Sequence, residues 1–411
     1  MDGLSSHGSV IRRPILVQRG TGLLHELGTA FLFREYPTNA LNTQKAVLRD
    51  LAFFLEWQAL RKAGDEDWKP PEQRIKLGKV GFPKGEIADF ARWAQVDARQ
   101  LTLAVATQTK KRANLPSGKP VHFQTFNRRM TTVGRYAAWI LQECDPRDDW
   151  SAEEHRLLES AANDLRRKFQ DYTVDGKDGA EIRSLNPTGM AALYDSLENN
   201  AELFPDTPVG RRDKLIIEVL LEGLRAGELL KLWCTDVDEH YEYELGKTVG
   251  CLSVRLRPNE VNDPRRDEPA GKTLPGLLPI PNQLARRLVD YITGDREAAV
   301  EKIDKPPPHL FVNLSGKYVG QPISQRHLNN IVARKRPPGL EGDFTPHVLR
   351  HTHFDEIYDD TSTKGVDPHQ TMLQRGRWSE NSNMPARYAR RSITKATAKY
   401  TASRDDQIRA R

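Results

Sequence analysis

The chain has 411 residues, enough for two or three domains with a substantial core. Hydrophobic residues make up 38% and charged residues 29%, and no apolar run approaches the ~20 residues that a membrane helix requires. The net charge of +6 and the pI of about 9.1 suit a polyanionic partner without identifying one. The cysteines Cys144, Cys234 and Cys251 form no CxxC pair, which argues against a disulfide framework and a cysteine-based zinc site.

The first predicted elements are helices. Residues 1–38 carry only a weak pattern, and we treat them as an N-terminal extension. From Asn42 to Gly64 apolar residues recur at helical spacing, with Asn42 as the candidate N-cap. Further helices are predicted at 86–96, 124–143 and 151–172, and the last opens with a capping-box pair, Ser151 and Glu154. Together these elements predict a small helical domain at residues 39–172.

A second domain is predicted at residues 187–411, after a polar, glycine-containing linker at 173–186. Its helical stretches are 190–200, 211–232, 282–294 and 324–336. Strand-like residues at 251–258 and 272–281 flank a long charged loop, and we expect them to form a hairpin. The pattern predicts a mostly α fold with a small antiparallel sheet (α+β), followed by a basic C-terminal tail.

Three histidines lie close together in "TPHVLRHTHFDEI". His347 and His351 are four residues apart, a spacing that can bind zinc on a helix face. However, no glutamate follows His347 as in the HExxH motif, and no third ligand is evident. The histidines alone therefore indicate a solvated helix start rather than a metal site, and His353 receives no role.

Three short boxes follow one another in the second domain, "GLRAGELLKL", "HVLRHTH" and "GRWSENSNMPARYAR". They contain, in this order, Arg225 and Glu228, His347 and Arg350, and Trp378 and Tyr388. Taken together, the boxes resemble those of the tyrosine recombinase, or phage-type integrase, family. The resemblance covers residues 187–400, which would form a catalytic domain. The helical domain before it resembles the family's core-binding domain, which clamps DNA.

The residue types in these boxes suit the breaking of a phosphodiester by transesterification. Charge builds on the non-bridging oxygens, and two arginines can clamp these oxygens bidentately without losing their own charge. We assign this clamp to Arg225 and Arg350, although Arg225 could instead form a salt bridge to Glu228 or Asp236. Tyr388 is the expected nucleophile, because cationic neighbours help a phenol to lose its proton. The resemblance implies a 3′-phosphotyrosine intermediate, and we expect no metal or other cofactor.

Acid–base chemistry would fall to His347 and a lysine. His347 can shuttle a proton or donate to the phosphate. Trp378 stands where most family members have histidine, and its indole can donate a hydrogen bond but cannot act as a base. Tyr388 follows Trp378 by ten residues, one more than the usual spacing, and Tyr400 is the rival nucleophile. The alternative role of Trp378 is ordinary core packing.

The candidate lysine is Lys272, in "KTLPGLLPIP". This stretch resembles the family's hairpin segment, whose lysine protonates the leaving 5′-oxygen. The insertion before it carries Arg265 and Arg266, and a solvated turn lysine is the alternative reading. We expect His351 to support the fold around Arg350, and Glu228 to orient Arg225.

Double-stranded DNA is the expected partner. A basic edge of the helical domain would contact its phosphates, through Lys110, Lys111, Arg112, Arg128 and Arg129. The resemblance implies a homotetramer on two DNA sites, with other recombinases or accessory proteins as further partners. The N-terminus has no apolar stretch typical of a signal peptide, so we expect a cytoplasmic, nucleoid-associated protein that does not enter membranes.

These features lead to the hypothesis of a site-specific DNA recombinase that integrates or excises a mobile element. Two alternatives remain. One is a DNA-binding accessory protein that keeps the fold but does not cut, and the other is a strand transferase similar to a type IB topoisomerase.

Overall fold

The computed structural model describes residues 2–4, 10–77, 79, 81–106, 120–144, 151–176, 184–244, 246–258, 260, 263–265 and 267–409. The chain divides into two compact units, Met1–Gly179 and Ala180–Arg411. Helices dominate both units and strands are few, so the predicted mostly α fold with a small antiparallel sheet is confirmed. Of the predicted DNA-binding residues, Lys110, Lys111 and Arg112 lie outside the described residues.

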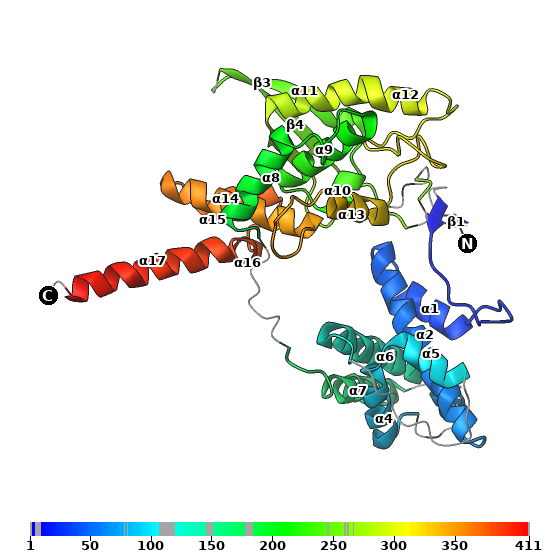
Figure 1. Cartoon of the computed structure of the whole chain (residues 1–411). Coiled ribbons are helices and arrows are strands. Elements are labelled where there is room, and N and C mark those ends of the chain that lie inside the picture. Colours follow the sequence, from blue (N-terminus) through cyan, green and yellow to red (C-terminus); the bar gives the residue numbers. More distant parts are fainter. Residues whose placement is uncertain are drawn as a thin grey trace. The chain divides into compact units, whose positions relative to one another are not determined.

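The first unit is a helical assembly with a short antiparallel pair of strands near its N-terminus (Figure 1). The strands are β1 (Asp2–Leu4) and β2 (Val10–Arg12). The helices are α1 (Glu26–Glu35), α2 (Leu41–Gly64), α3 (Pro71–Lys76), α4 (Lys84–Ala94), α5 (Ala98–Ala106), α6 (Phe123–Glu143) and α7 (Ala152–Gln170).

Aromatic rings make up much of the core of the first unit. The ring of Phe54 lies 5.5 Å from that of Trp57, 5.3 Å from that of Phe90 and 6.1 Å from that of Tyr136, centre to centre. All four side chains are buried. Stacked and edge-to-face contacts of this kind stabilise beyond the area that they bury. Because the rings come from α2, α4 and α6, they hold these three helices together.

Two predicted helix starts have different outcomes. Ser151 and Glu154 form the predicted capping box at the start of α7, with the Glu154 amide donating to the Ser151 hydroxyl at 3.3 Å. The predicted cap at Asn42 is wrong, because α2 begins at Leu41 with Ala40 as its N-cap. Asn42 lies inside the first turn, where its side chain is no longer at the capping position.

The second unit combines helices with a three-stranded sheet. The strands are β3 (Val237–Glu242), β4 (Lys247–Val254) and β5 (Gly276–Ile280). The helices are α8 (Pro187–Asn199), α9 (Pro208–Leu221), α10 (Ala226–Leu230), α11 (Asn282–Tyr291), α12 (Glu297–Val300), α13 (Gln325–Arg334), α14 (Pro346–Thr363), α15 (Pro368–Gly376), α16 (Met384–Tyr388) and α17 (Arg390–Arg409). A 3-10 turn (Cys234–Asp236) precedes β3, and a π-helical turn (Ile292–Arg296) joins α11 to α12.

The sheet is antiparallel throughout, in the order β3-β4-β5. The predicted hairpin is confirmed by the pairing of β4 with β5, in which Leu252 lies opposite Leu278. Helix α11 packs against β3 and β4, as Figure 1 shows. Gly250 allows this close approach, since a Cβ there would lie 2.5 Å from the Cβ of Ala285. The buried residues of this layer continue into α9 and α13 as one hydrophobic core.

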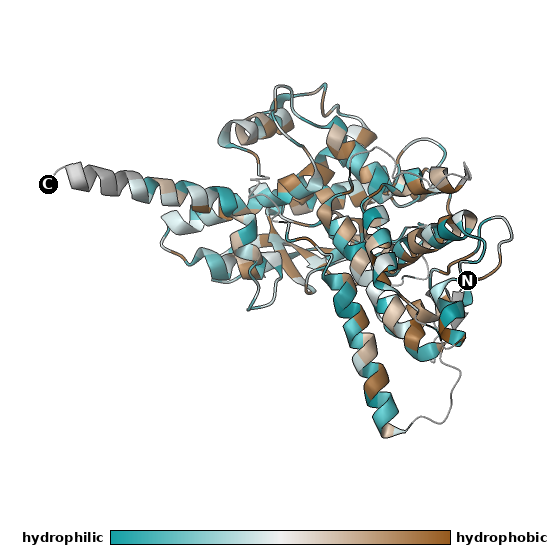
Figure 2. Ribbon diagram, turned by 90° about the horizontal axis from the view of Figure 1, so that it is seen from below, coloured by the Kyte–Doolittle hydropathy of each residue, from teal (hydrophilic) through white to brown (hydrophobic). Residues whose placement is uncertain are grey.

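Helix α17 leaves the end of the second unit as a long helix (Figure 1). Figure 2 shows hydrophilic residues along its coloured part, and Tyr400 is largely exposed there. Of the helices in the described part of the chain, none is both long and apolar enough to span a bilayer.

Candidate active site

The arginines of the first two boxes are brought together by a turn at Gly223. The chain leaves α9 at Gly223 with φ of +85°, a conformation that favours glycine. A Cβ at this position would lie 2.4 Å from the ring of His353 on α14, so glycine is also required for space. The Gly223 carbonyl accepts a hydrogen bond from Nη1 of Arg350. The turn therefore positions Arg225, the N-cap of α10, near the start of α14.

Glu228 is the buried carboxylate to which the arginines are bound. Its Oε2 accepts from the main-chain N–H of Arg225 at 3.0 Å and from Nη2 of Arg377 at 2.6 Å. Oε1 lies 3.3 Å from Nη1 of Arg225 and accepts from the Thr273 hydroxyl at 2.5 Å. Arg350 Nη1 lies 3.8 Å from Oε2. The predicted alternative for Arg225, a salt bridge to Glu228, is thus present, and it is one contact of a larger cluster.

The charge of Glu228 is fixed by this cluster. Burial alone would raise the pKa of the Glu228 carboxyl, but Arg377 and Arg350 and the hydrogen bonds from Thr273 and the Arg225 main chain lower it below its ordinary value. The carboxylate is therefore ionised at neutral pH, and it is the only carboxylate that pairs with these three arginines among the described residues. Three guanidinium groups on one carboxylate leave an excess of positive charge.

Arg350 is fully buried among aromatic rings. Its guanidinium carbon lies 4.9 Å from the ring centre of Phe354, 5.2 Å from that of Trp378 and 5.3 Å from that of Tyr388. Burial and the nearby Arg225 together lower the pKa of Arg350 to about 10, against the opposing effects of Glu228 and Tyr388. Arg350 still carries its charge at neutral pH, in a site where water screens it little.

Tyr388 lies inside this aromatic cluster, at the end of α16. Its ring stacks on His351, with centres 4.2 Å apart and planes at 26°, and on Trp378, at 5.2 Å and 30°. The His347 ring lies 5.7 Å away, and its Nε2 lies 3.1 Å from Nε2 of His351. Tyr388 is 3% exposed, whereas His347 is exposed. The structure thus gathers His347, His351 and Arg350 from α14 with Trp378 and Tyr388.

Lys272 lies close to this cluster because the two residues that follow it contact the cluster. The Thr273 hydroxyl contacts Glu228, and the Leu274 amide donates to the Arg377 carbonyl at 3.0 Å. These contacts hold the loop before β5 against the site, while the Lys272 side chain is exposed. Tyr400 belongs to no part of the cluster, since it is 68% exposed on α17.

Sequence reasoning missed two residues of the site, Arg377 and Thr273. Arg377 directly precedes Trp378, so its place in the third box was a usable signal. Thr273 directly follows Lys272. Nothing in the sequence indicates that both side chains bind Glu228, which lies far upstream.

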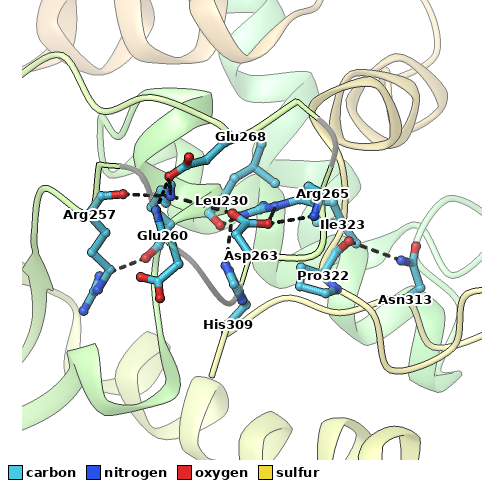
Figure 3. Close-up of polar contacts among 11 residues, drawn as sticks. Leu230, Arg257, Glu260, Asp263, Arg265, Glu268, His309, Asn313, Pro322 and Ile323 are labelled. Atoms are coloured by element: carbon cyan, nitrogen blue, oxygen red, sulfur yellow. Dashed lines mark hydrogen bonds and ion pairs between the residues drawn. The ribbon is translucent and has the colours of Figure 1, made fainter. Parts of the chain in front are cut away.

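Several described residues of the insertion before Lys272 are buried in the second unit rather than exposed as a charged loop. Figure 3 shows Asp263 and Arg265 paired at its centre, and Arg265 also donates to the carbonyls of Leu230 and Ile323 at 3.0 and 3.1 Å. Beside them Lys231 pairs with Glu268, which is buried. These contacts give Arg265 a structural role. Arg266 lies outside the described residues.

The two described arginines of the predicted DNA-binding edge differ sharply. Arg129 is buried, donates to the carbonyls of Ala94 and Val96 at 2.8 and 2.6 Å, and lies 3.8 Å from the ring centre of Phe53. Arg128 is half exposed, and its guanidinium pairs with Asp50 at 2.8 Å. Arg129 thus caps carbonyls at the end of α4, and only Arg128 presents charge to solvent.

A metal site has no support in the described residues, where no group of three or more histidine, cysteine or acidic side chains is placed to hold an ion. The pair formed by His347 and His351 thus lacks a third ligand in the part of the chain that the structure covers.

Comparison with known proteins gives a distant similarity to a mobile-element protein. No protein-family model matches the chain. Transposase A from transposon Tn554 of Staphylococcus aureus, in strains Mu50 and N315, is 27% identical to it over 149 residues. The match covers 36% of this chain, and the chain spans only 36% of the length of these relatives.

Proposed function

We propose that this protein is a site-specific DNA recombinase that cuts and rejoins DNA through a 3′-phosphotyrosine intermediate, with Tyr388 as the nucleophile. The observation that carries the proposal is the convergence of three separated segments on Tyr388. Arg350 and His351 come from α14, Trp378 follows α15, and Arg225 joins them through Glu228. The distant similarity to a transposase supports a role in moving a mobile element.

The excess positive charge of the site favours an anionic substrate. Arg225, Arg350 and Arg377 share the single carboxylate of Glu228. A phosphodiester would bring the missing negative charge, and guanidinium groups match its oxygens bidentately. Fixed donors in a site screened from water also stabilise the charge that develops during phosphoryl transfer. The cluster therefore suits a reaction at a DNA phosphate.

The reaction is a transesterification. The Tyr388 phenolic oxygen bonds to the scissile phosphorus while the bond from phosphorus to the 5′-oxygen breaks. His347 takes the phenol proton, and Lys272 supplies a proton to the leaving 5′-oxygen. The indole N–H of Trp378 donates a hydrogen bond to the scissile phosphate. One phosphodiester is exchanged for another, so the reverse attack by a 5′-hydroxyl rejoins the strand without an energy source.

The first unit would bind the DNA backbone, and the half-exposed Arg128 is a candidate for contacting a phosphate. Lys110, Lys111 and Arg112 are proposed as further contacts from the sequence alone. We also propose that four protomers act on two DNA sites, with the exposed helix α17 packing against a neighbouring protomer. Sedimentation of the protein with duplex DNA would measure this stoichiometry.

A covalent trapping experiment tests the reaction. Nicked duplexes that tile the DNA on either side of the coding region are incubated with the protein and separated on a denaturing gel. We expect a protein–DNA adduct with the wild type and with Tyr400→Phe, and none with Tyr388→Phe. An adduct that persists in Tyr388→Phe would exclude this nucleophile.

Two other results would point to the alternatives. Shifted DNA mobility without any adduct would indicate a non-cutting binding protein. Relaxation of supercoiled DNA that lacks all tiled sequences would indicate a topoisomerase-like strand transferase.

A further inference from the structure

Arg377 has an unusual backbone conformation for an arginine. Its φ of 52° and ψ of 47° place it in the left-handed region, and no other non-glycine residue in the described ranges has a positive φ. It ends α15, with its amide donating to the Gln374 carbonyl at 3.1 Å. Glycine takes this position most readily, because a side chain here is strained. Non-glycine residues persist in such conformations mainly where the surrounding structure holds them, as at functional sites.

The side chain of Arg377 is buried and only partly satisfied. Nη2 donates to Glu228 at 2.6 Å and lies 3.4 Å from the Thr273 hydroxyl. Nε and Nη1 have no hydrogen-bond partner and almost no contact with solvent. Burial lowers the pKa of Arg377. Glu228 raises it and so offsets part of this effect, whereas Arg225 lowers it further. A residue needed only to pair with Glu228 would not require the two further buried donors.

Other donors around Arg377 are unsatisfied as well. Nε of Arg350 and Nε1 of Trp378 are buried and without a partner in the structure. All of these groups are N–H donors, so the ligand that completes them must be rich in acceptors. The three arginines around Glu228 carry more positive charge than this one carboxylate neutralises, which implies that the ligand is an anion. A tetrahedral phosphate, with several acceptor oxygens and a negative charge, meets both conditions.

We propose that Arg377 is a third guanidinium ligand of the DNA phosphate, contacting it through Nε and Nη1. The inference rests on the proposed function only in identifying this phosphate as the scissile one. Arg377 is well placed for this role, because its carbonyl holds the loop that carries Lys272 and its neighbour Trp378 stacks on Tyr388. The orphaned nitrogens have almost no contact with solvent, so phosphate binding requires a local rearrangement of the packing around them. Arg225 is partly exposed and His347 is exposed.

A titration with inorganic phosphate tests the ligand role without knowledge of the DNA site. Three variants are compared with the wild type: Arg377→Gly, which suits the left-handed backbone, Arg377→Lys, which keeps the charge, and Arg286→Ala as an exposed control. Binding is measured as the phosphate-dependent rise in melting temperature at constant ionic strength. Loss of a charge-assisted contact should weaken phosphate binding about tenfold in Arg377→Gly, less in Arg377→Lys, and not in the control. Equal phosphate binding by Arg377→Gly and the wild type overturns the proposal.

A second measurement separates a phosphate ligand from a purely structural arginine. The nicked duplex that gives an adduct is prepared with either a phosphate or an uncharged methylphosphonate at the scissile position. Arg377→Gly should slow adduct formation about tenfold on the phosphate and clearly less on the methylphosphonate, which needs less positive charge. An equal slowing on both substrates would show that Arg377 acts only through the fold. If the wild type forms no adduct, the proposed function fails, and the phosphate titration still decides the role of Arg377.

Discussion

The guanidinium carbon of Arg350 lies 5.3 Å from the centre of the Tyr388 ring. The two residues come from separate helices, and this contact joins the most deeply buried cation of the site to the proposed nucleophile. The same guanidinium group can bind a phosphate. In the proposed reaction Arg350 would therefore hold the phosphate close to the attacking tyrosine. The site should therefore depend on the residues that hold Arg350 in place, such as Glu228.

Glu228→Gln should destabilise the second unit strongly. The change removes the only carboxylate that pairs with Arg225, Arg350 and Arg377 among the described residues. Breaking a buried ion pair by removing one partner typically costs about 3–5 kcal/mol. The free energy of unfolding, measured by urea denaturation, should fall by this amount. Glu239→Gln, at an exposed pair with Arg286, should change it by less than about 0.5 kcal/mol.

The same carboxylate predicts a pH dependence. The pKa of Glu228 is lowered in the folded state, so its ionisation stabilises the fold above the ordinary glutamate pKa. This contribution is lost as the pH falls from about 4.5 through the lower, folded pKa. Urea unfolding of the wild type between pH 5 and pH 3 should show this loss, and Glu228→Gln should show less of it. Parallel curves for the two proteins would contradict the assignment.

His353 predicts a pH effect at milder acidity. Burial, with Arg375 and Arg350 nearby, lowers the pKa of His353 well below its ordinary value, so the folded protein keeps it neutral. Its Nε2 accepts from Nε of Arg375 at 3.3 Å, and the ring also bonds to the Leu221 main chain. Below about pH 6.5 the unfolded chain binds a proton that the folded chain does not, so stability falls by about 1.4 kcal/mol per pH unit.

His353→Asn should remove this part of the pH dependence, because asparagine keeps a donor but does not titrate. Urea unfolding at pH 7.5, 6.5 and 5.5 measures the slope. His309 and His327 also have lowered pKa values and should keep their contributions in the variant. A slope unchanged by His353→Asn would mean that His353 is not kept neutral in the fold.

The sequence predicted the part of the site that depends on residue type and order. Arg225, Arg350 and Tyr388 stand in boxes that can be read along the chain, and the structure brings them together. The sequence could not predict which side chains contact Glu228, because these contacts depend on the turn at Gly223 and on the left-handed backbone of Arg377. Strand β3 was missed as well, since its exposed charged residues lack the apolar alternation that marks a strand.

The charged insertion shows the same limit. A run of charges normally indicates a solvated loop, yet Asp263, Arg265 and Glu268 are all buried. Their partners include Lys231 and main-chain carbonyls on other segments, so burial is possible only once these segments have packed. Composition describes the charge of a segment, but not whether the fold supplies a partner for each charge.

Asp263→Asn should therefore destabilise the second unit as a core mutation would. Burial alone would raise the pKa of Asp263, but His309 and Arg265 lower it strongly, so the residue is ionised. In the wild type Arg265 and Lys231 both pair with the Asp263 carboxylate, and the variant removes this charge. The free energy of unfolding should fall by about 3–5 kcal/mol. Melting of the protein by calorimetry measures the loss, with Glu301→Gln as an exposed control. A melting temperature equal to the wild type would show that the pair is dispensable.

Arg128 and Arg129 are neighbours with opposite expected roles, which makes them a matched pair for testing DNA binding by the first unit. Arg129→Ala removes two hydrogen bonds to carbonyls and a cation–π contact, and should destabilise the unit by about 3 kcal/mol. Arg128→Gln keeps a donor for Asp50 but removes the positive partner of this buried carboxylate, so it should also lower the stability of the unit. It should lower the slope of log affinity against log salt by about 1. Fluorescence anisotropy with a labelled duplex at several salt concentrations gives this slope, and urea denaturation gives the stability. If Arg128→Gln leaves the slope unchanged, Arg128 makes no phosphate contact, and the DNA must be bound elsewhere on the protein.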